Sequence, residues 1–362
     1  MNGNKWISRL ILLPASKMYG LATWTRNKMF DLGILRQKEF NVPVIVVGNI
    51  AAGGTGKTPH VEYIISALRH AYHIAVLSRG YKRTTRGFIM ASQRSTPADI
   101  GDESYQIFHK FNCEVTVAVC EDRVAGINEP LRIDPNINLV ILDDAFQHRY
   151  VKPQVSIVIT EFSRPVFEDK LLPYGRLRES KQGLHRADIV IASKCTDKIK
   201  ALDYSIFAAN LDLYPYQKLF FSKFEYGALM PVFPDQAPAV APSLDWLTSD
   251  DMVLALAGIG NPRPFVRRIK YYKARVRVNV FPDHHNFSRK DLALIKKRFE
   301  SMDGRNNFII TTEKDAVRLA NNPYFPHELK QYIYYLPVKV AFMRDASGTF
   351  EDTLRRLIKT KL

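Results

Sequence analysis

The most regular feature of the chain is a series of short, unbroken apolar runs separated by stretches with helical spacing. The first run, residues 44–47, is rich in β-branched side chains, and apolar positions at helical spacing follow within residues 61–68. Further runs of the same kind occur at residues 74–77, 115–119, 139–142, 155–159 and 189–192. Because strands buried on both faces read as continuous apolar runs, this alternation predicts an α/β fold with a doubly wound parallel sheet.

The composition changes near residue 214. The stretch up to residue 244 is rich in aromatic residues and proline, which favours extended strands and a linker. A second α/β unit follows, with predicted strands at residues 253–257, 276–281 and 308–311 and a closing helix at residues 352–358. We therefore predict an N-terminal helix, a first α/β domain, linker strands, and a second, smaller α/β lobe that includes the closing helix. Their predicted ranges are residues 1–35, 36–213, 214–244 and 245–362.

Residues 6–30 combine apolar side chains, such as Trp6 and Trp24, with cationic ones, such as Arg9 and Lys17. A signal peptide would need a longer apolar region and a small-residue cleavage site. No stretch of the chain approaches the length of about 18 apolar residues that marks a membrane span. The pattern fits an amphipathic helix in a membrane interface, and it fits equally well a helix packed on its own domain.

Charge is the unusual property of the composition. The 362 residues include 52 Lys and Arg against 36 Asp and Glu, a formal net charge of +16, whereas the hydrophobic fraction of 46% is ordinary for a globular protein. Such a chain attracts anions, so nucleic acid, phosphorylated small molecules and an acidic membrane surface are all candidate partners. Cys113, Cys120 and Cys195 have no metal-type spacing and cannot all pair, which favours a reducing cytoplasm.

The strongest chemical motif follows the first predicted strand. It approximates the phosphate-loop pattern of Gly, four residues and Gly-Lys-Ser/Thr, with alanine in place of the first glycine. Glycines let backbone amides turn towards phosphate oxygens, and the start of the following helix favours negative charge. Lys57 is predicted to reach the β- and γ-phosphates of a nucleotide, and Thr58 to supply an oxygen to Mg²⁺. The predicted nucleotide-binding residues are Ala51, Ala52, Gly53, Gly54, Thr55, Gly56, Lys57 and Thr58.

Three further motifs place acidic and basic groups at the ends of predicted elements. Asp143 and Asp144 end a buried strand, where a carboxylate can hold Mg²⁺ directly or through water. Asp102 and Glu103 follow a glycine, where they either cap a helix or furnish a base for a substrate hydroxyl. His284 follows an aspartate and is a candidate acid/base or orienting group, although successive histidines are also common on surfaces.

These motifs, in this order, resemble those of the tetraacyldisaccharide 4′-kinase family, the lipid A 4′-kinases of Gram-negative bacteria. The phosphate loop is generic, but Ser-Arg-Gly-Tyr at residues 78–81, Asp-Asp-Ala-Phe-Gln-His at 143–148 and Leu-Arg-Glu at 177–179 are specific in combination. Ala145 replaces the usual glycine and Ser104 the frequent proline, and neither change removes a reactive group. Other matching segments lie at residues 101–103, 121–123, 281–284 and 311–315.

The resemblance implies a kinase that uses ATP and Mg²⁺ to phosphorylate the 4′-hydroxyl of a lipid-linked glucosamine disaccharide 1-phosphate, in lipid A and lipopolysaccharide biosynthesis. It implies a P-loop NTPase-like kinase domain and a second α/β lobe joined by a β-strand linker. It also implies an N-terminal helix that meets the cytoplasmic face of the inner membrane. With this reading the basic surplus faces an anionic membrane, and neither nucleic acid nor a required protein partner is expected.

The resemblance further implies roles for individual residues. Asp102 and His284 match the catalytic pair, with Asp102 taking the hydroxyl proton, while Lys57 neutralises charge on the phosphates. The carboxylates implied to position metal and phosphate are Glu103, Asp143 and Asp144. The residues implied to lie near the substrate or the transferred phosphate are Tyr81, Arg123, Gln147 and Arg178.

Two other classes of protein share part of the pattern. A nucleotide-driven switch or assembly ATPase would have the phosphate loop and the strand-end aspartate, but it would not need Asp102 and His284 beside a sugar hydroxyl. A nucleic-acid-binding protein is suggested by charge alone, and the sequence contains no recognised nucleic-acid module. Stimulation of ATP turnover by a phosphorylated glycolipid, by a protein or by nucleic acid would distinguish the three.

Overall fold

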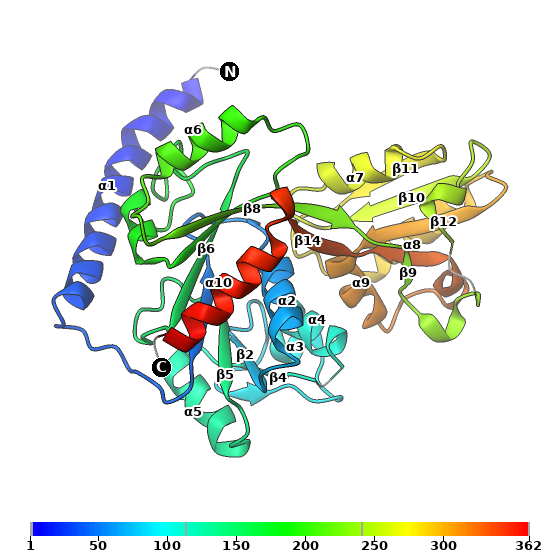
Figure 1. Ribbon diagram of the computed structural model, residues 1–362. Coiled ribbons are helices and arrows are strands. Elements are labelled where there is room, and N and C mark those ends of the chain that lie inside the picture. Colours follow the sequence, from blue (N-terminus) through cyan, green and yellow to red (C-terminus); the bar gives the residue numbers. More distant parts are fainter. Residues whose placement is uncertain (1–2, 113, 240–241, 361–362) are drawn as a thin grey trace.

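The computed structural model describes residues 3–112, 114–239 and 242–360. It consists of two lobes, each built on its own sheet, with a long helix along the outer side of the first lobe (Figure 1). The first sheet has the strand order β14-β8-β7-β6-β1-β5-β2-β4-β3, and its strands pair in parallel except for the edge strands β3 and β14. These strands are β1 (Val44–Gly48), β2 (Ile74–Ser78), β3 (Ile89–Met90), β4 (Thr116–Val119), β5 (Leu139–Asp143), β6 (Val155–Glu161), β7 (Ile189–Ser193), β8 (Lys218–Tyr226) and β14 (Val338–Phe342).

Both faces of the first sheet are buried. Successive side chains of a strand point to opposite faces, so each strand contributes to two cores. Ile45 and Val47 of β1 belong to a core that α2, α4 and α10 cover, whereas Val44 and Val46 belong to a second core under α5 and α6. The continuous apolar runs therefore predicted the sheet correctly. The helices of this lobe are α2 (Lys57–Leu68), α3 (Pro97–Ile100), α4 (Asp102–Lys110), α5 (Arg123–Ile133), α6 (Ala201–Leu211) and α10 (Ser347–Thr360).

The second lobe is built on a smaller sheet with the order β11-β10-β12-β13-β9, in which β9 pairs antiparallel with β13. Helix α7 packs on one face, and α8 and α9 pack on the other. The strands are β9 (Met230–Pro231), β10 (Met252–Ala257), β11 (Arg275–Val280), β12 (Asn307–Thr312) and β13 (Ile333–Leu336), and the helices are α7 (Arg263–Lys270), α8 (Arg289–Glu300) and α9 (Glu313–Ala320).

The chain passes between the lobes twice, outward from β8 to β9 and back from β13 to β14. The two crossings lie side by side, because β8 and β14 pair antiparallel from Val338↔Tyr226 to Phe342↔Ser222 (Figure 1). The predicted linker strands thus extend the two sheets. The closing helix, predicted with the second lobe, packs instead in the core of the first through Phe350, Leu354 and Ile358. Its apolar spacing indicated a buried face but not which sheet that face covers.

Helix α1 (Gly3–Asp31) lies against the first lobe through its second half. Ser16 Oγ donates to Leu171 O at 2.7 Å, and Tyr19 OH donates to Arg178 O at 2.9 Å. Within the described ranges of the chain, no helix is long and apolar enough to cross a membrane.

The cysteines of the first lobe that the structure describes are buried in its interior. Cys120 and Cys195 are both free thiols, and Cys113 lies outside the described residues. Burial raises the pKa of Cys195 to about 12, which keeps this thiol neutral.

Candidate active site

Residues 51–58 form a glycine-rich turn between β1 and α2. Gly53 and Gly56 have φ angles of 108° and 89°, a region that residues with a Cβ rarely adopt, and a Cβ on Gly56 would also overlap the ring of Phe224. Helix α2 begins at Lys57 with no side-chain cap and no acidic residue in its first turn, so its first amides are available to an anion. This is the strand, loop and helix context that a phosphate loop requires.

Buried polar groups fix the loop from behind. Ser193 Oγ, at the end of β7, donates to Thr55 O at 2.8 Å. The His60 ring bridges the loop and β8, with Nδ1 2.7 Å from Gly56 O and Nε2 2.9 Å from Ser222 Oγ. Burial lowers the pKa of His60 to about 4, although the bond to Gly56 acts to raise it, so the ring is neutral. Because a carbonyl only accepts, the proton must sit on Nδ1, and Nε2 accepts from Ser222.

The strand-end carboxylates lie beside the loop, since Val47 and Asp143 are register partners in adjacent strands. Asp144 has a φ of 49°, and its Oδ1 is 3.4 Å from Lys57 Nζ and 3.0 Å from Arg178 Nη1. Burial acts to raise the pKa of Asp144, but the charges of Lys57 and Arg178 outweigh it and lower that pKa. Asp144 is therefore the ionised member of the pair.

Asp143 has the opposite character. Burial first, and the charge of Asp144 second, raise the pKa of Asp143 to about 7. Its buried Oδ1 makes no hydrogen bond to any residue that the structure describes. An unpaired carboxylate oxygen at this position fits Mg²⁺ or a water that Mg²⁺ holds. In the described parts of the chain no three His, Cys, Asp or Glu side chains gather as metal ligands, but Mg²⁺ usually takes only one or two protein carboxylates.

Gln147 connects motifs that lie far apart in the sequence. Its Nε2 donates to Asn49 O at 2.7 Å and to Glu179 Oε1 at 2.9 Å, and its Oε1 lies 3.4 Å from Arg178 Nη1. Glu179 is 3% exposed and also accepts from Asn27 of α1 at 3.2 Å. The sequence predicts Gln147 near the substrate and predicts no role for Glu179. In the structure these hydrogen bonds connect the residue after β1, Arg178 and helix α1.

The other predicted substrate residues, Tyr81 and Arg123, differ in exposure. Arg123 is 3% exposed and donates to Cys120 O, and its pKa is lowered by burial although the charges of Asp143 and Asp144 act to raise it. Tyr81 is 61% exposed, and its ring meets that of His284 edge-on. Tyr81 is thus open to a ligand, whereas Arg123 acts on the carboxylates through its charge.

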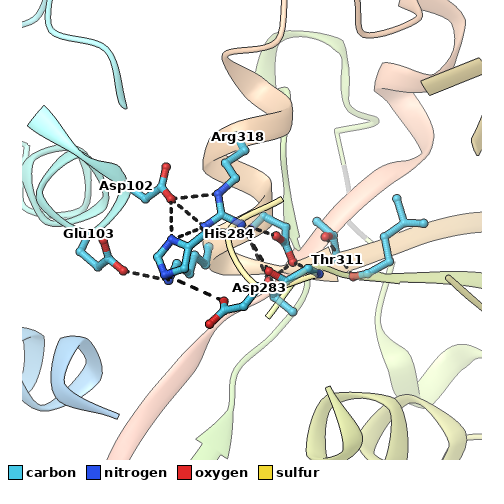
Figure 2. A network of polar contacts seen from close by, with 11 residues as sticks. Asp102, Glu103, Asp283, His284, Thr311 and Arg318 are labelled. Carbon is cyan, nitrogen blue, oxygen red and sulfur yellow. Dashed lines mark hydrogen bonds and ion pairs between the residues drawn. The ribbon is translucent and has the colours of Figure 1, made fainter. Parts of the chain in front are cut away.

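A second cluster joins the lobes (Figure 2). Asp102 opens α4 on the first lobe and His284 follows β11 on the second, yet His284 Nδ1 lies 3.4 Å from Asp102 Oδ2. The His284 backbone is held at a φ of 58° with its N–H donating to Gly258 O at 3.2 Å. The structure thus brings together two residues that are 182 positions apart in the chain.

Two cations of α9, for which the sequence predicted no role, complete this cluster. Arg318 Nη2 lies 2.6 Å from Asp102 Oδ2, and Lys314 Nζ lies 2.9 Å from His284 Nε2. Burial acts to raise the pKa of Asp102, but hydrogen bonds from His284 and Arg318, with the charges of Arg318 and Lys314, hold it at about 2. Glu103, predicted as a metal ligand, forms a 2.8 Å ion pair with Lys314.

The signal for these cations was present in the sequence. Lys314 falls inside the matched segment at residues 311–315, and Arg318 follows it at the spacing of four that places side chains on one face of a helix. The spacing alone could not reveal that this face meets the first turn of α4.

Comparisons with known proteins identify the family to which the chain belongs. The family model of tetraacyldisaccharide-1-P 4′-kinase matches residues 8–359. The chain belongs to this family. The tetraacyldisaccharide 4′-kinase of Bacteroides thetaiotaomicron is 48% identical over 355 residues, which cover 96% of this chain and 92% of the relative. That of Porphyromonas gingivalis is 42% identical over 364 residues, which cover 99% and 98%.

A solved structure is also similar. It is a crystal structure of the "apo" form of LpxK from Aquifex aeolicus in complex with ATP, with a TM-score of 0.73, 27% identity, and coverage of 96% of this chain and 98% of that one. The match confirms the predicted P-loop NTPase-like fold. As a member of the 4′-kinase family the protein is an enzyme, a kinase of the 4′ position of tetraacyldisaccharide 1-phosphate in lipid A biosynthesis, as the motifs predicted.

Proposed function

We propose that this 4′-kinase transfers the γ-phosphate of ATP directly to the 4′-hydroxyl of the glycolipid, with Asp102 as the base. The observation that carries the proposal is the position of Asp102, which is held at one oxygen by side chains of the second lobe. Within the part of the chain that the structure describes, no hydrogen bond reaches its other oxygen, Oδ1 (Figure 2). Oδ1 is therefore the atom that would accept the hydroxyl proton.

The atoms of the reaction balance without a further reactant. The 4′ oxygen forms a bond to the γ-phosphorus, the bond from that phosphorus to the β–γ bridging oxygen breaks, and ADP leaves. The proton of the hydroxyl passes to Asp102 Oδ1. A carboxylate of low pKa suffices, because the transition state of phosphoryl transfer is loose and positioning matters more than base strength.

The phosphate loop and its neighbours would hold ATP, the nucleotide in the crystal structure of LpxK from Aquifex aeolicus. The loop amides and Lys57 would bind its phosphates, and Arg178, paired with Asp144 on the same side, adds a second fixed positive charge. Thr58, Asp143 and Asp144 would hold Mg²⁺, which supplies neutralising charge to the phosphate oxygens when bound. We assign Glu103 to the contact between the lobes, because Lys314 engages its carboxylate.

We further propose that the enzyme is a peripheral protein of the cytoplasmic face of the inner membrane, bound through α1. One side of this helix packs on the first lobe, which leaves its other side to lie against a membrane surface. Its exposed cations, Lys17 and Lys28, suit anionic headgroups. Large apolar side chains project into solvent from the other side, an arrangement that suits a helix lying in a membrane interface. They are Ile11, Met18, Leu21 and Trp24, which are 63%, 73%, 64% and 53% exposed.

The site draws its groups from the two lobes of one chain, so we propose that catalysis requires no protein partner. The test is a kinase assay with the disaccharide 1-phosphate and γ-labelled ATP. We expect label on the glycolipid in step with ADP release, and little ATP turnover without the acceptor. ATP turnover that responds to nucleic acid or to a protein, and not to the glycolipid, would contradict the proposal.

A further inference from the structure

Helix α9 begins with a hydrogen-bonded segment, residues 312–315, that has no part in the proposed reaction. Thr312 caps the helix, with its Oγ1 accepting from the Asp315 N–H at 3.2 Å. Asp315 is fully buried, and its Oδ2 accepts from the Gly258 N–H and from the Thr312 hydroxyl, both at 2.7 Å. These bonds leave Asp315 Oδ1 for Arg318 Nη1, one turn later, at 2.9 Å. The segment therefore builds a rigid, buried support for one guanidinium group.

That support aims Arg318 at the first lobe (Figure 2). Nε and Nη2 of Arg318 both donate to Oδ2 of Asp102, at 2.9 Å and 2.6 Å. Arg318 is only 8% exposed, and its planar group holds all of these donors in a fixed geometry. The orientation of the Asp102 carboxylate is thus determined from α9, which belongs to the other lobe.

The way in which the two groups meet is unusual for an ion pair that serves stability alone. A bidentate arginine–carboxylate pair normally uses both carboxylate oxygens, one for each donor. Here both donors of Arg318 share Oδ2, and Oδ1 of Asp102 receives no hydrogen bond from the described residues. His284 Nδ1 is the third group at Oδ2, and it lies 3.2 Å from Arg318 Nη2 because both donate to the same oxygen.

Lys314 determines which nitrogen of the His284 ring carries the proton. Its Nζ lies 2.9 Å from His284 Nε2 and 2.8 Å from Glu103 Oε1. An ammonium group only donates, so Nε2 must accept and the ring carries its proton on Nδ1, the nitrogen that faces Asp102. Asp102 and Glu103 of the first lobe therefore pair with Arg318 and Lys314. These two cations lie one turn apart on a single face of α9.

We propose that Arg318 is a positioning residue of the phosphoryl transfer, which holds Asp102 by Oδ2 so that Oδ1 faces the acceptor hydroxyl. The inference rests on the proposed role of Asp102 as the base. Because the support belongs to the second lobe, the base is oriented only while the two lobes are in contact. Contact between the lobes and alignment of the base are then a single event, as in enzymes whose closure completes the catalytic arrangement.

The test uses the full-length enzyme with Arg318→Ala, Arg318→Gln and Arg318→Lys, so that at least one folded variant is available. We expect kcat to fall by about 100-fold in Arg318→Ala, with the KM for ATP changed by less than about twofold, because the loss is one of alignment. Lysine should restore little, since one ammonium group cannot reproduce the fork. Guanidinium ion at tens of millimolar should raise the kcat of Arg318→Ala by about tenfold, because it supplies the missing group. Arg275→Ala, which removes an ion pair to Asp303 on the outside of the same lobe, is the matched control and should keep its activity.

The decisive readout is the same substitution in an Asp102→Ala background. Because Arg318 acts through Asp102, its removal there should lower the residual rate by less than about twofold. Equal losses in both backgrounds, full activity of Arg318→Ala, or no response of its rate to guanidinium would overturn the inference. The proposed function fails separately, if Asp102→Ala itself keeps full activity.

Discussion

His60 Nε2 and Ser222 Oγ lie 2.9 Å apart in the interior of the first lobe, and this hydrogen bond joins the phosphate loop to strand β8. The other ring nitrogen of His60 holds Gly56 O, so the histidine spans the distance between the loop and the strand. Strand β8 leads on to the second lobe (Figure 1). The phosphate loop is thereby connected to β8, the strand from which the chain passes to the second lobe. His284 and Arg318 of that lobe contact Asp102.

Replacement of Ser222 by alanine tests this coupling. The change leaves a buried acceptor on His60 unpaired, which costs about 1–3 kcal/mol and should lower the melting temperature by several degrees. The KM for ATP should rise because the loop loses its anchor. Thermal unfolding and ATP titration measure both effects, and Ser205→Ala, an exposed serine bonded only within its own helix, is the control. Equal behaviour of the two variants would contradict the coupling.

Gly56→Ala tests the geometry of the phosphate loop itself. The residue has a φ of 89°, and a Cβ would overlap the ring of Phe224, so the substitution must distort the loop. We expect ATP binding to fall by at least about tenfold in a calorimetric titration. Gly348→Ala is the control, because a Cβ there meets no atom within 4 Å. An ATP affinity of Gly56→Ala equal to that of the wild type would show that the loop does not bind as described.

Lys110 Nζ of α4 pairs with Glu62 of α2 at 2.7 Å and with Glu313 of α9 at 2.8 Å, and the pH dependence of stability tests this contact. Burial first, and then the charge of Glu313, raise the pKa of Glu62 from 4.5 to about 7, although Lys110 acts to lower it. A group with a raised pKa in the folded state binds its proton more tightly there. Its contribution to stability is present below about pH 4.5 and is lost as the pH rises through 7.

Glu62→Gln removes this titration. Relative to the wild type, the variant should therefore gain stability as the pH rises from 4.5 to 7, by an amount on the order of 3 kcal/mol. His60 works in the opposite direction, since its pKa of about 4 makes its contribution present above pH 6.5 and lost as the pH falls through 4. The measurement is the melting temperature of the wild type and of Glu62→Gln across this pH range. Curves that run parallel would show that Glu62 does not titrate in this window.

The sequence predicted the sheet and the phosphate loop because each depends on local patterns. Residues 44–47 are apolar throughout since both faces of β1 are covered, and the glycines at 53 and 56 have the backbone angles that the motif demands. The packing of α10 on the first lobe escaped prediction, because an amphipathic helix carries no information about its partner.

The candidate site was predictable to the same extent. Lys57, Asp143 and Asp144 lie at the ends of adjacent elements, so their proximity follows from the topology of the sheet. Arg318 and Glu179 did not stand out, because what they do depends on contacts 216 and 152 residues away, with Asp102 and with Asn27. Arg123 and Gln147 matched specific motifs, yet their burial and bonding were visible only in three dimensions.

Substitutions on the outer side of α1 test the membrane proposal without removing the contacts of its inner side. Met18→Glu combined with Leu21→Glu should reduce binding to anionic vesicles by at least about tenfold, because exposed apolar area is replaced by charges that anionic headgroups repel. Activity on glycolipid dispersed in detergent should change by less than about twofold. Ile133→Glu, at an apolar site on α5 that is 50% exposed, is the control in a vesicle sedimentation assay. Undiminished binding of the α1 variant would contradict the proposal.

The most direct test of the whole account is the rate at which Asp102→Ala transfers the γ-phosphate of ATP to the disaccharide 1-phosphate, measured with its affinity for ATP. The account predicts that turnover falls by about 10²–10⁴-fold, the usual contribution of a positioned base, while the dissociation constant for ATP stays within about twofold of the wild type. Turnover close to that of the wild type would contradict it.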